Sequence, residues 1–177
     1  MTFELPPIHS FPPFFTRQPN VETFNSQRQQ WAAIILEYYR HNKLFQLSLN
    51  AETINSALFT NRSIKRSLKL DTLMEIIEHM VAQNQAEWLT KKKGDVLIYW
   101  RRPEDWAQAL IKYVEDTGQN GSILTMYELT EAEEAERSEF YKMDKVMLRK
   151  VVDVLSKRGK AVIMKGSDGE EQGIKFL

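Results

Sequence analysis

The feature that most constrains the fold is an internal repeat, because the chain matches itself at an offset of 75 residues without a gap. The offset pairs aromatic with aromatic residues and apolar with apolar residues in the two halves. The pairs include Trp31 with Trp106, Ile35 with Leu110, Leu36 with Ile111, Tyr38 with Tyr113, Leu49 with Leu124, Leu73 with Leu148, Ile76 with Val151, Ile77 with Val152, Met80 with Leu155, Ala86 with Ala161 and Gly94 with Gly169. Two unrelated helical domains would rarely agree so far, so the sequence predicts two copies of one small domain.

The first half contains helical and strand-like patterns in a defined order. Apolar residues recur every three or four places in the helical segments and every second place in the strands. The expected helices cover 27–41, 61–67 and 70–84, the segment 50–58 suits a short helix or a turn, and the expected strands cover 45–49, 86–89 and 96–100. Gly94-Asp95 lies between the last two strands and predicts a hairpin, and Asp71 is expected to cap the last helix. Helix, strand, helix, helix and hairpin is the order of a winged helix.

The second half repeats that order. The expected helices cover 103–118, 127–140 and 144–159, and the expected strands cover 123–126, 161–164 and 173–176. Pro103 suits the first turn of a helix, and Asp144 suits an N-cap. We therefore predict an α+β fold, mainly α, with tandem winged-helix domains at 21–102 and 103–177 and almost no linker between them.

The N-terminal tail, residues 1–20, differs in composition from both repeats. Five of the six prolines lie in it, namely Pro6, Pro7, Pro12, Pro13 and Pro19. Proline fixes φ near −65° and disfavours αR in the preceding residue, so the tail should be extended and close to polyproline II. An extended strand cannot bury Phe11, Phe14 and Phe15 against itself. The tail must therefore lie either across its own domain or in the groove of a partner, and stiff proline-rich segments are typical recognition elements.

Composition narrows the function classes. Lys and Arg number 24 and Asp and Glu also number 24, and a zero net charge argues against a body that grips nucleic acid or an anionic membrane. There is no cysteine, which excludes disulfides, thiol catalysis and thiolate metal sites. We expect a soluble intracellular protein, because no secretory signal or membrane-spanning run is visible.

Motifs of catalysis are also missing from the sequence. The three histidines, His9, His41 and His79, are not spaced as metal ligands, and no phosphate-binding loop or nucleophile elbow occurs. The acidic run Glu128–Glu139 lacks the spacing of a calcium loop, which favours a solvated helix face. We expect neither enzyme activity, nor a cofactor, nor a bound metal.

Duplex DNA binding is the alternative that a winged helix raises, since such domains read DNA with their third helix. The third helix of the first half has no Lys or Arg between Asp71 and Gln85, so it would repel phosphate. The third helix of the second half is mildly basic, and Lys91–Lys93 form a second basic cluster. Arg101-Arg102 at the junction suits either a hinge clamp that pairs with acids or a contact with a partner.

Three segments together give a resemblance to a known family. They are Phe11 to Asn20, the stretch Leu97 to Trp106, and Gly118-Gln119-Asn120 with Thr125 to Leu129. In these segments the chain resembles the vacuolar protein sorting-associated protein 25 family, the small subunit of the ESCRT-II complex, and the resemblance covers essentially the whole chain.

The resemblance implies a non-catalytic scaffold made of two tandem winged helices. Two copies join one copy each of two larger ESCRT-II subunits, and N-terminal Pro-Pro-x-aromatic motifs dock in hydrophobic pockets of those subunits. The implied docking residues are Pro6, Pro7, Phe11, Pro12, Pro13, Phe14 and Phe15. Pro12, Pro13 and Phe15 match the second motif, with Phe where some members have Tyr, whereas His9 stands at the aromatic position of the first motif.

The resemblance also implies a role for the second domain, which recruits the first ESCRT-III subunit during sorting of ubiquitinated cargo into multivesicular bodies. The basic residues Lys145, Arg149 and Lys150 are our hypothesis for that contact, based on their charge. The protein is then expected to be cytoplasmic and to reach the endosomal membrane only indirectly. The alternative is a winged-helix DNA-binding transcription regulator, which the acidic third helix of the first half disfavours.

Overall fold

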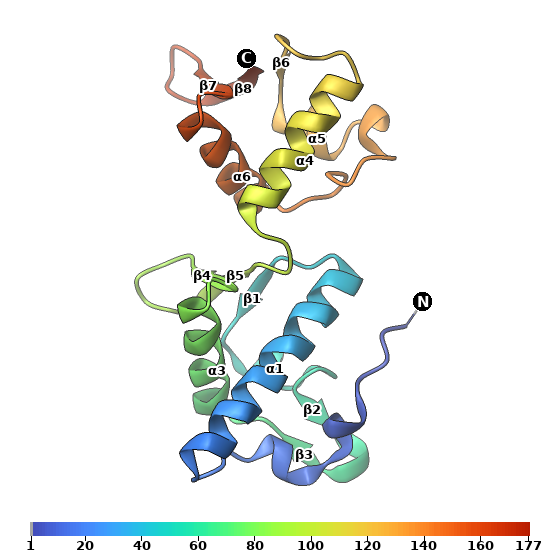
Figure 1. The fold of residues 1–177 in the computed structure, drawn as a ribbon, viewed down its shortest axis with the longest axis vertical. Coiled ribbons are helices and arrows are strands. Elements are labelled where there is room, and N and C mark those ends of the chain that lie inside the picture. The colour runs from blue at the N-terminus through green and yellow to red at the C-terminus, as the bar shows by residue number, and fades with distance from the viewer. Residues whose placement is uncertain (1) are drawn as a thin grey trace. The chain divides into compact units, whose positions relative to one another are not determined.

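The computed structural model describes residues 2–177 and divides the chain into two compact units, one ending at Trp100 and the other beginning at Arg101 (Figure 1). The sequence predicts the boundary slightly later, after Arg102. Both units contain, in the same order, a helix, a strand, a short helix, a helix and two strands, as the internal repeat predicts, and the first unit adds a small hairpin at 60–67 before its last helix. Each unit is described by itself below.

The first unit packs two long helices over a small antiparallel sheet. Its elements are the 3-10 turns η1 (Pro7–Ser10) and η2 (Pro12–Phe15), α1 (Val21–Asn42), β1 (Gln46–Ser48), α2 (Ala51–Ile54), β2 (Thr60–Asn61), the 3-10 turn η3 (Arg62–Ile64), β3 (Arg66–Ser67), α3 (Leu70–Ala82), β4 (Ala86–Trp88) and β5 (Asp95–Ile98). The sheet order is β1-β5-β4, with Val96 of β5 opposite Leu47 on one side and Trp88 on the other. β2 and β3 form a separate two-stranded hairpin.

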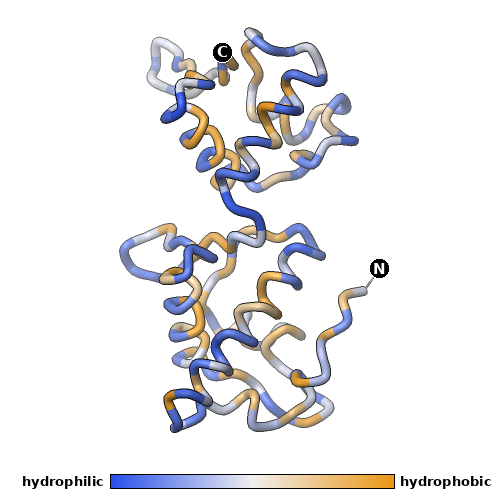
Figure 2. Tube along the Cα trace, in the orientation of Figure 1, coloured by the Kyte–Doolittle hydropathy of each residue, from blue (hydrophilic) through white to orange (hydrophobic). Residues whose placement is uncertain are grey.

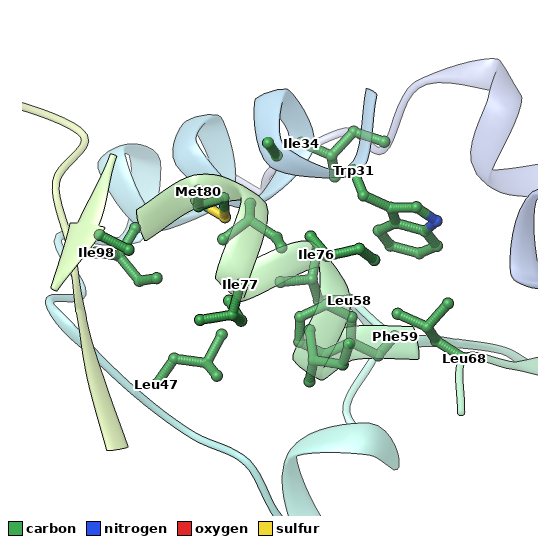
Figure 3. Close-up of a cluster of buried hydrophobic side chains, with 14 of the residues drawn as sticks. Trp31, Ile34, Leu47, Leu58, Phe59, Leu68, Ile76, Ile77, Met80 and Ile98 are labelled. Carbon is green, nitrogen blue, oxygen red and sulfur yellow. The ribbon is translucent and has the colours of Figure 1, made fainter. Parts of the chain in front are cut away.

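The core of the first unit lies between α1, α3 and the sheet. Figure 3 shows Trp31 and Ile34 of α1 facing Ile76, Ile77 and Met80 of α3, with Leu47 of β1 below Ile77 and Ile98 of β5 to the left. Ile76, Ile77 and Met80 are fully buried because their spacing lines one side of a helix. Figure 2 shows hydrophobic (orange) and hydrophilic (blue) segments alternating along the tube in both units.

The second unit repeats this arrangement. Its elements are α4 (Pro103–Asp116), β6 (Ile123–Leu124), α5 (Met126–Thr130), the 3-10 turn η4 (Glu133–Ala135), α6 (Lys145–Lys157), β7 (Ala161–Lys165) and β8 (Glu171–Phe176), with sheet order β6-β8-β7. Helices α4 and α6 pack on each other. Asp144 caps α6 by accepting a hydrogen bond from the Met147 amide at 2.9 Å, which confirms the predicted cap.

Several local predictions are wrong. Helix α1 begins at Val21, earlier than the predicted 27–41, and its cap is Asn20, which accepts from the Thr23 amide at 3.0 Å, and not Asn25 or Ser26, the candidates nearest to the predicted start. The segment 61–67 is the β2–β3 hairpin around η3 and not a helix, although Asn61 does cap η3. The segment 127–140 is mostly irregular, because α5 ends at Thr130 and only a 3-10 turn follows. Asp71 lies in the first turn of α3, whose N-cap is Lys69.

The proline-rich tail is also not the extended polyproline II segment that its composition predicts. It folds into η1 and η2, with extended backbone at Pro6, Phe11 and Thr16. The physical reason is that the φ fixed by proline suits a 3-10 turn as well as polyproline II, and each turn begins at a proline. What selects the turns is the surface on which the tail lies.

Candidate functional site

The N-terminal strap, which we define as residues 6–19, lies on the first unit. In Figure 1 it is the dark blue segment that passes between the start of α1 and the β2–β3 hairpin. Phe14 and Phe15 are 4% and 3% exposed and belong to the core of this unit. Of the two placements that the sequence left open, the structure therefore has the strap on its own domain.

Aromatic contacts with Trp31 hold the strap. Phe14 stacks on Trp31 with ring centroids 4.3 Å apart and 6° between the planes, and Phe15 meets the same indole edge-on at 5.4 Å. His9 packs edge-on against Phe15 at 5.1 Å. Aromatic pairs in these geometries add about 0.5–1.5 kcal/mol each beyond the area they bury, so the strap is an ordered part of the unit.

Buried polar groups of α1 clamp the strap backbone. The Gln27 amide nitrogen donates to the carbonyl oxygens of Phe14 and Thr16, both at 2.8 Å. The Trp31 indole N–H donates to the same Phe14 oxygen at 3.0 Å. Gln27 is buried, and its bond to the Phe14 carbonyl oxygen satisfies an acceptor that packs away from water.

His9 fastens the first turn of the strap at a second point. Its Nε2 lies 2.8 Å from the carbonyl oxygen of Leu58, and the Asn61 side-chain amide donates to the carbonyl oxygen of His9 at 2.8 Å. His9 is itself buried. His9, which stands at the aromatic position of the first motif, thus attaches the strap to its own domain.

The seven expected docking residues face in different directions. Phe14 and Phe15 point into the unit, and Pro6 and Pro12 are half-buried. Phe11 is 55% exposed, and Pro7 and Pro13 are exposed as well. Of these seven residues, Phe11, Pro7 and Pro13 are therefore the ones that a partner can reach.

The second expected site, on α6, is less basic than its sequence indicates. Lys145 is exposed, but Arg149 pairs with Asp153 one turn later, Nε to Oδ1 3.1 Å, and Lys150 is half-buried. The three cations lie on one helix, as the sequence predicts, and the Asp153 carboxylate partly neutralises their charge.

Arg101 forms a local cluster within the second unit. Its guanidinium donates to Glu139 at 3.0 Å and lies 4.4 Å from the centre of the Trp106 ring. Of the two roles left open for the Arg101-Arg102 pair, Arg101 makes the acid pairing that a clamp requires, whereas Arg102 precedes α4 and is exposed.

The exposed side of α3 carries acid rather than base. Glu75 accepts a hydrogen bond from Arg17 of the strap at 2.6 Å, and Glu78 lies 3.6 Å from Lys93. His79 is half-buried on the same helix, and burial together with the charge of Arg28 lowers its pKa. A helix with this charge does not favour contact with duplex phosphates.

Neither a cluster of metal ligands nor a membrane-spanning helix occurs in the described part of the chain. Among the side chains that the structure describes, which leave out those of residues 1, 171 and 172, no group of three or more His, Asp or Glu converges as metal ligands would. No helix among the described residues is both long and apolar enough to cross a bilayer.

Two sets of residues at this site were not expected from the sequence. One is Gln27, which the helical pattern places on α1 but which no local signal links to a strap carbonyl more than ten residues away. The other is the β2–β3 hairpin with Asn61. Its sequence signal was present, since 53–70 contains no Asp or Glu and four cations, Arg62, Lys65, Arg66 and Lys69.

Comparisons with known proteins agree with this geometry. The ESCRT-II complex subunit family matches residues 8–144. The chain is 41% identical over 175 residues to vacuolar protein-sorting-associated protein 25 of Schizosaccharomyces pombe, covering 98% of each chain. It is 38% identical over 177 residues to the protein of that name from Xenopus laevis, covering 100% of each.

Solved structures of VPS25 and of the ESCRT-II complex also resemble this chain. A crystal structure of subunit VPS25 of the endosomal trafficking complex ESCRT-II matches with a TM-score of 0.87 at 29% identity, covering 98% of each chain. A crystal structure of the endosomal complex ESCRT-II (VPS22/VPS25/VPS36) contains a chain that matches with a TM-score of 0.84 at 29% identity, covering 97% of this chain and 98% of that one. Both matches include the strap and the two units.

Proposed function

The chain belongs to the ESCRT-II complex subunit family, and on this premise we propose that it docks on the larger ESCRT-II subunits through the outer side of its N-terminal strap. Its general role, as an ESCRT-II subunit in endosomal sorting, follows from the family. The docking surface consists of Phe11, Pro7 and Pro13, supported from below by Phe14 and Phe15.

The exposure of Phe11 on an ordered strap is the observation that supports this proposal. A phenylalanine that is 55% exposed on a backbone already held in 3-10 turns is an anchor whose docking costs little conformational entropy. Aromatic anchors of this kind contribute most of the binding free energy at many interfaces. The partners we propose are the counterparts of VPS22 and VPS36, which share a solved complex with a structurally similar chain.

The remaining parts of the proposal concern the second unit and the assembly. We infer that two copies of this chain join one copy of each larger subunit, that the protein is cytoplasmic and reaches endosomal membranes through those partners, and that it has no catalytic role. The second unit then recruits the first ESCRT-III subunit, with Lys145, Arg149 and Lys150 as contact residues. In this proposal, the complex acts in the sorting of ubiquitinated cargo into multivesicular bodies.

The docking proposal is tested by co-purification of the full chain with the two larger subunits. The variant Phe11→Ala with Pro13→Ala removes exposed groups only, so it should fold normally and lose binding. Val21→Ala is the matched control, because Val21 is a 73% exposed apolar residue of the same unit just outside the strap. Retained binding by a correctly folded strap variant contradicts the proposal.

A separate experiment tests the ESCRT-III contact. Arg149→Glu combined with Lys150→Glu should weaken binding of the first ESCRT-III subunit by an ESCRT-II complex that contains this chain. Lys157→Glu, at the end of the same helix, is the control for a general effect of charge. Equal binding by the double variant and the wild type would exclude the α6 surface.

A further inference from the structure

A groove of about 500 Å³ lies in the first unit between the end of the strap, the first turns of α1 and the second half of α3. We call it the α1–α3 groove, and its lining residues come from the segments 17–28 and 75–82. The proposed docking residues of the strap are not among those lining residues. The groove is therefore a surface separate from the one that docks on the larger subunits.

Two guanidinium groups lie against one buried aromatic ring in this groove. Arg17 lies 4.3 Å and Arg28 lies 4.9 Å from the centre of the Phe24 ring. Phe24 is buried, so the ring is a fixed support. Such cation–π contacts hold a guanidinium in position and leave its N–H groups available to an acceptor. The groove thus presents positioned donors beside apolar surface.

The two guanidinium groups differ in their counterions. The two carboxylates that border the groove, Glu75 and Glu78, are each paired with a cation, Arg17 and Lys93 respectively. Among the residues that the structure describes, Arg28 forms no ion pair, and its buried Nε has no hydrogen-bond partner. The charge of Arg28 therefore has no counterion in the described part of the groove.

His79 lies in the same groove and responds to that charge. It is half-buried, and burial together with the positive charge of Arg28 lowers its pKa. The imidazole is therefore neutral near pH 7, with one N–H donor. The positive potential of Arg28 reaches this side chain although two carboxylates lie on the same helix. An anion placed between Arg28 and His79 would meet a charge and a neutral donor.

A single carboxylate fits this charge better than a phosphate group does. One guanidinium without a counterion matches one negative charge, whereas Glu75 and Glu78 at the border would repel a phosphate dianion. Arg28 now donates to the side-chain oxygen of Asn25. An ionised carboxylate is a stronger acceptor than an amide oxygen, so it would replace a weak partner by a strong one.

The open shape of the groove favours a peptide over a free small molecule. Pro19, Val21 and Ala82 line the groove and are exposed, and all three are apolar. Sites for small molecules usually bury most of the ligand surface, which an open groove does not do. An extended peptide needs to bury only one side, with an acidic side chain on the guanidinium and an apolar neighbour on the exposed apolar residues.

We propose that the α1–α3 groove binds an acidic peptide segment of a partner protein, with one Asp or Glu carboxylate on the Arg28 guanidinium and an apolar side chain of the segment against Val21 and Ala82. This gives the first unit a second binding site, whose recognition rests on charge complementarity and not on proline. The inference does not depend on strap docking, because the two sites share no residue named for either role.

The test titrates two probe peptides into the full chain and follows the imidazole signals of His79 by NMR. The peptides are acetyl-Leu-Glu-Leu-amide and acetyl-Leu-Gln-Leu-amide, which differ only in the charge of one side chain. The Glu peptide should bind with a Kd of about 1 mM and the Gln peptide about tenfold more weakly, because a hydrogen bond between charged groups is lost. The Glu peptide should also raise the pKa of His79, since a nearby carboxylate stabilises the imidazolium.

The variant Arg28→Gln should bind both peptides equally. Arg40→Gln is the matched control, because it makes the same charge change on an exposed residue of the same helix, and it should keep the preference for the Glu peptide. The NMR spectrum of each variant also checks that it is folded.

Three results would overturn the inference. One is equal binding of the two peptides by the wild type at concentrations up to about 10 mM, a comparison that needs no variant. Another is a preference for the Glu peptide that persists in folded Arg28→Gln. The third is binding of the Glu peptide that leaves the His79 signals unchanged, because the site would then lie elsewhere on the chain.

Discussion

Replacing Gln27 by leucine tests whether the strap is clamped by hydrogen bonds or only by aromatic packing. Leucine keeps the approximate volume and the apolar contacts of the side chain but removes the amide donors and the Oε1 that accepts from the Gln18 amide at 3.3 Å. The wild-type amide makes two 2.8 Å bonds, to the carbonyl oxygens of Phe14 and Thr16. At about 1 kcal/mol net for each bond, the expected loss in the unfolding free energy of the first unit is about 2 kcal/mol.

Two features keep that loss from being larger. The Phe14 oxygen retains the indole N–H of Trp31 at 3.0 Å, and the Thr16 oxygen retains the side-chain amide of Gln18 at 2.8 Å. Neither carbonyl is therefore left without a donor, which would add the full desolvation penalty. Cavity formation adds little, because leucine fills nearly the same volume.

The assay is urea unfolding of the full chain combined with hydrogen exchange of the strap amides. Gln30→Leu on the same helix is the control, because Gln30 is exposed and its side chain donates to the Ser26 hydroxyl at 3.1 Å and not to the strap. We expect the Gln27 variant to unfold at lower urea and the amides of Phe14 and Thr16 to exchange faster, with the control unchanged. Equal unfolding free energies, within about 0.5 kcal/mol, would refute the clamp.

Three further predictions concern other parts of the fold. Gly173→Ala should destabilise the second unit by about 1–3 kcal/mol, since its added Cβ would meet Cγ2 of Ile123 at 2.6 Å, and Ile123→Ala should restore the stability in urea unfolding. Thr125→Ala should cost about 1 kcal/mol in the same assay, because it breaks the capping box with Glu128. His79 has a pKa lowered by burial and by Arg28, so the folded state binds a proton less readily than the unfolded state. The first unit should therefore be fully stable above about pH 6.5 and lose stability as the pH falls below that value, which unfolding of His79→Gln should not show.

The order of helices and strands could be predicted because it depends on local residue patterns that can be recognised in the sequence alone. The helical spacing of Ile76, Ile77 and Met80, the strand alternation and the glycine of each hairpin are local signals, and the internal repeat doubled their weight. The segments that failed, 61–67 and 127–140, are those in which helix-favouring residues lack a continuous apolar stripe. Tertiary contacts decided their conformation, as when Thr60 and Ser67 bond across the β2–β3 hairpin.

The sequence by itself determined that this protein is a repeat of one small domain with a stiff, aromatic-rich tail that had to be covered by something. It also determined the family, because the motifs that carry the resemblance are contiguous stretches. Only the tertiary structure decided what covers the tail, which aromatic rings face inward, and that a basic hairpin distant in sequence lies beside it. The reason is that Gln27, Trp31, His9 and Asn61 meet through space, and no periodicity along the chain encodes which buried donor will reach which carbonyl oxygen.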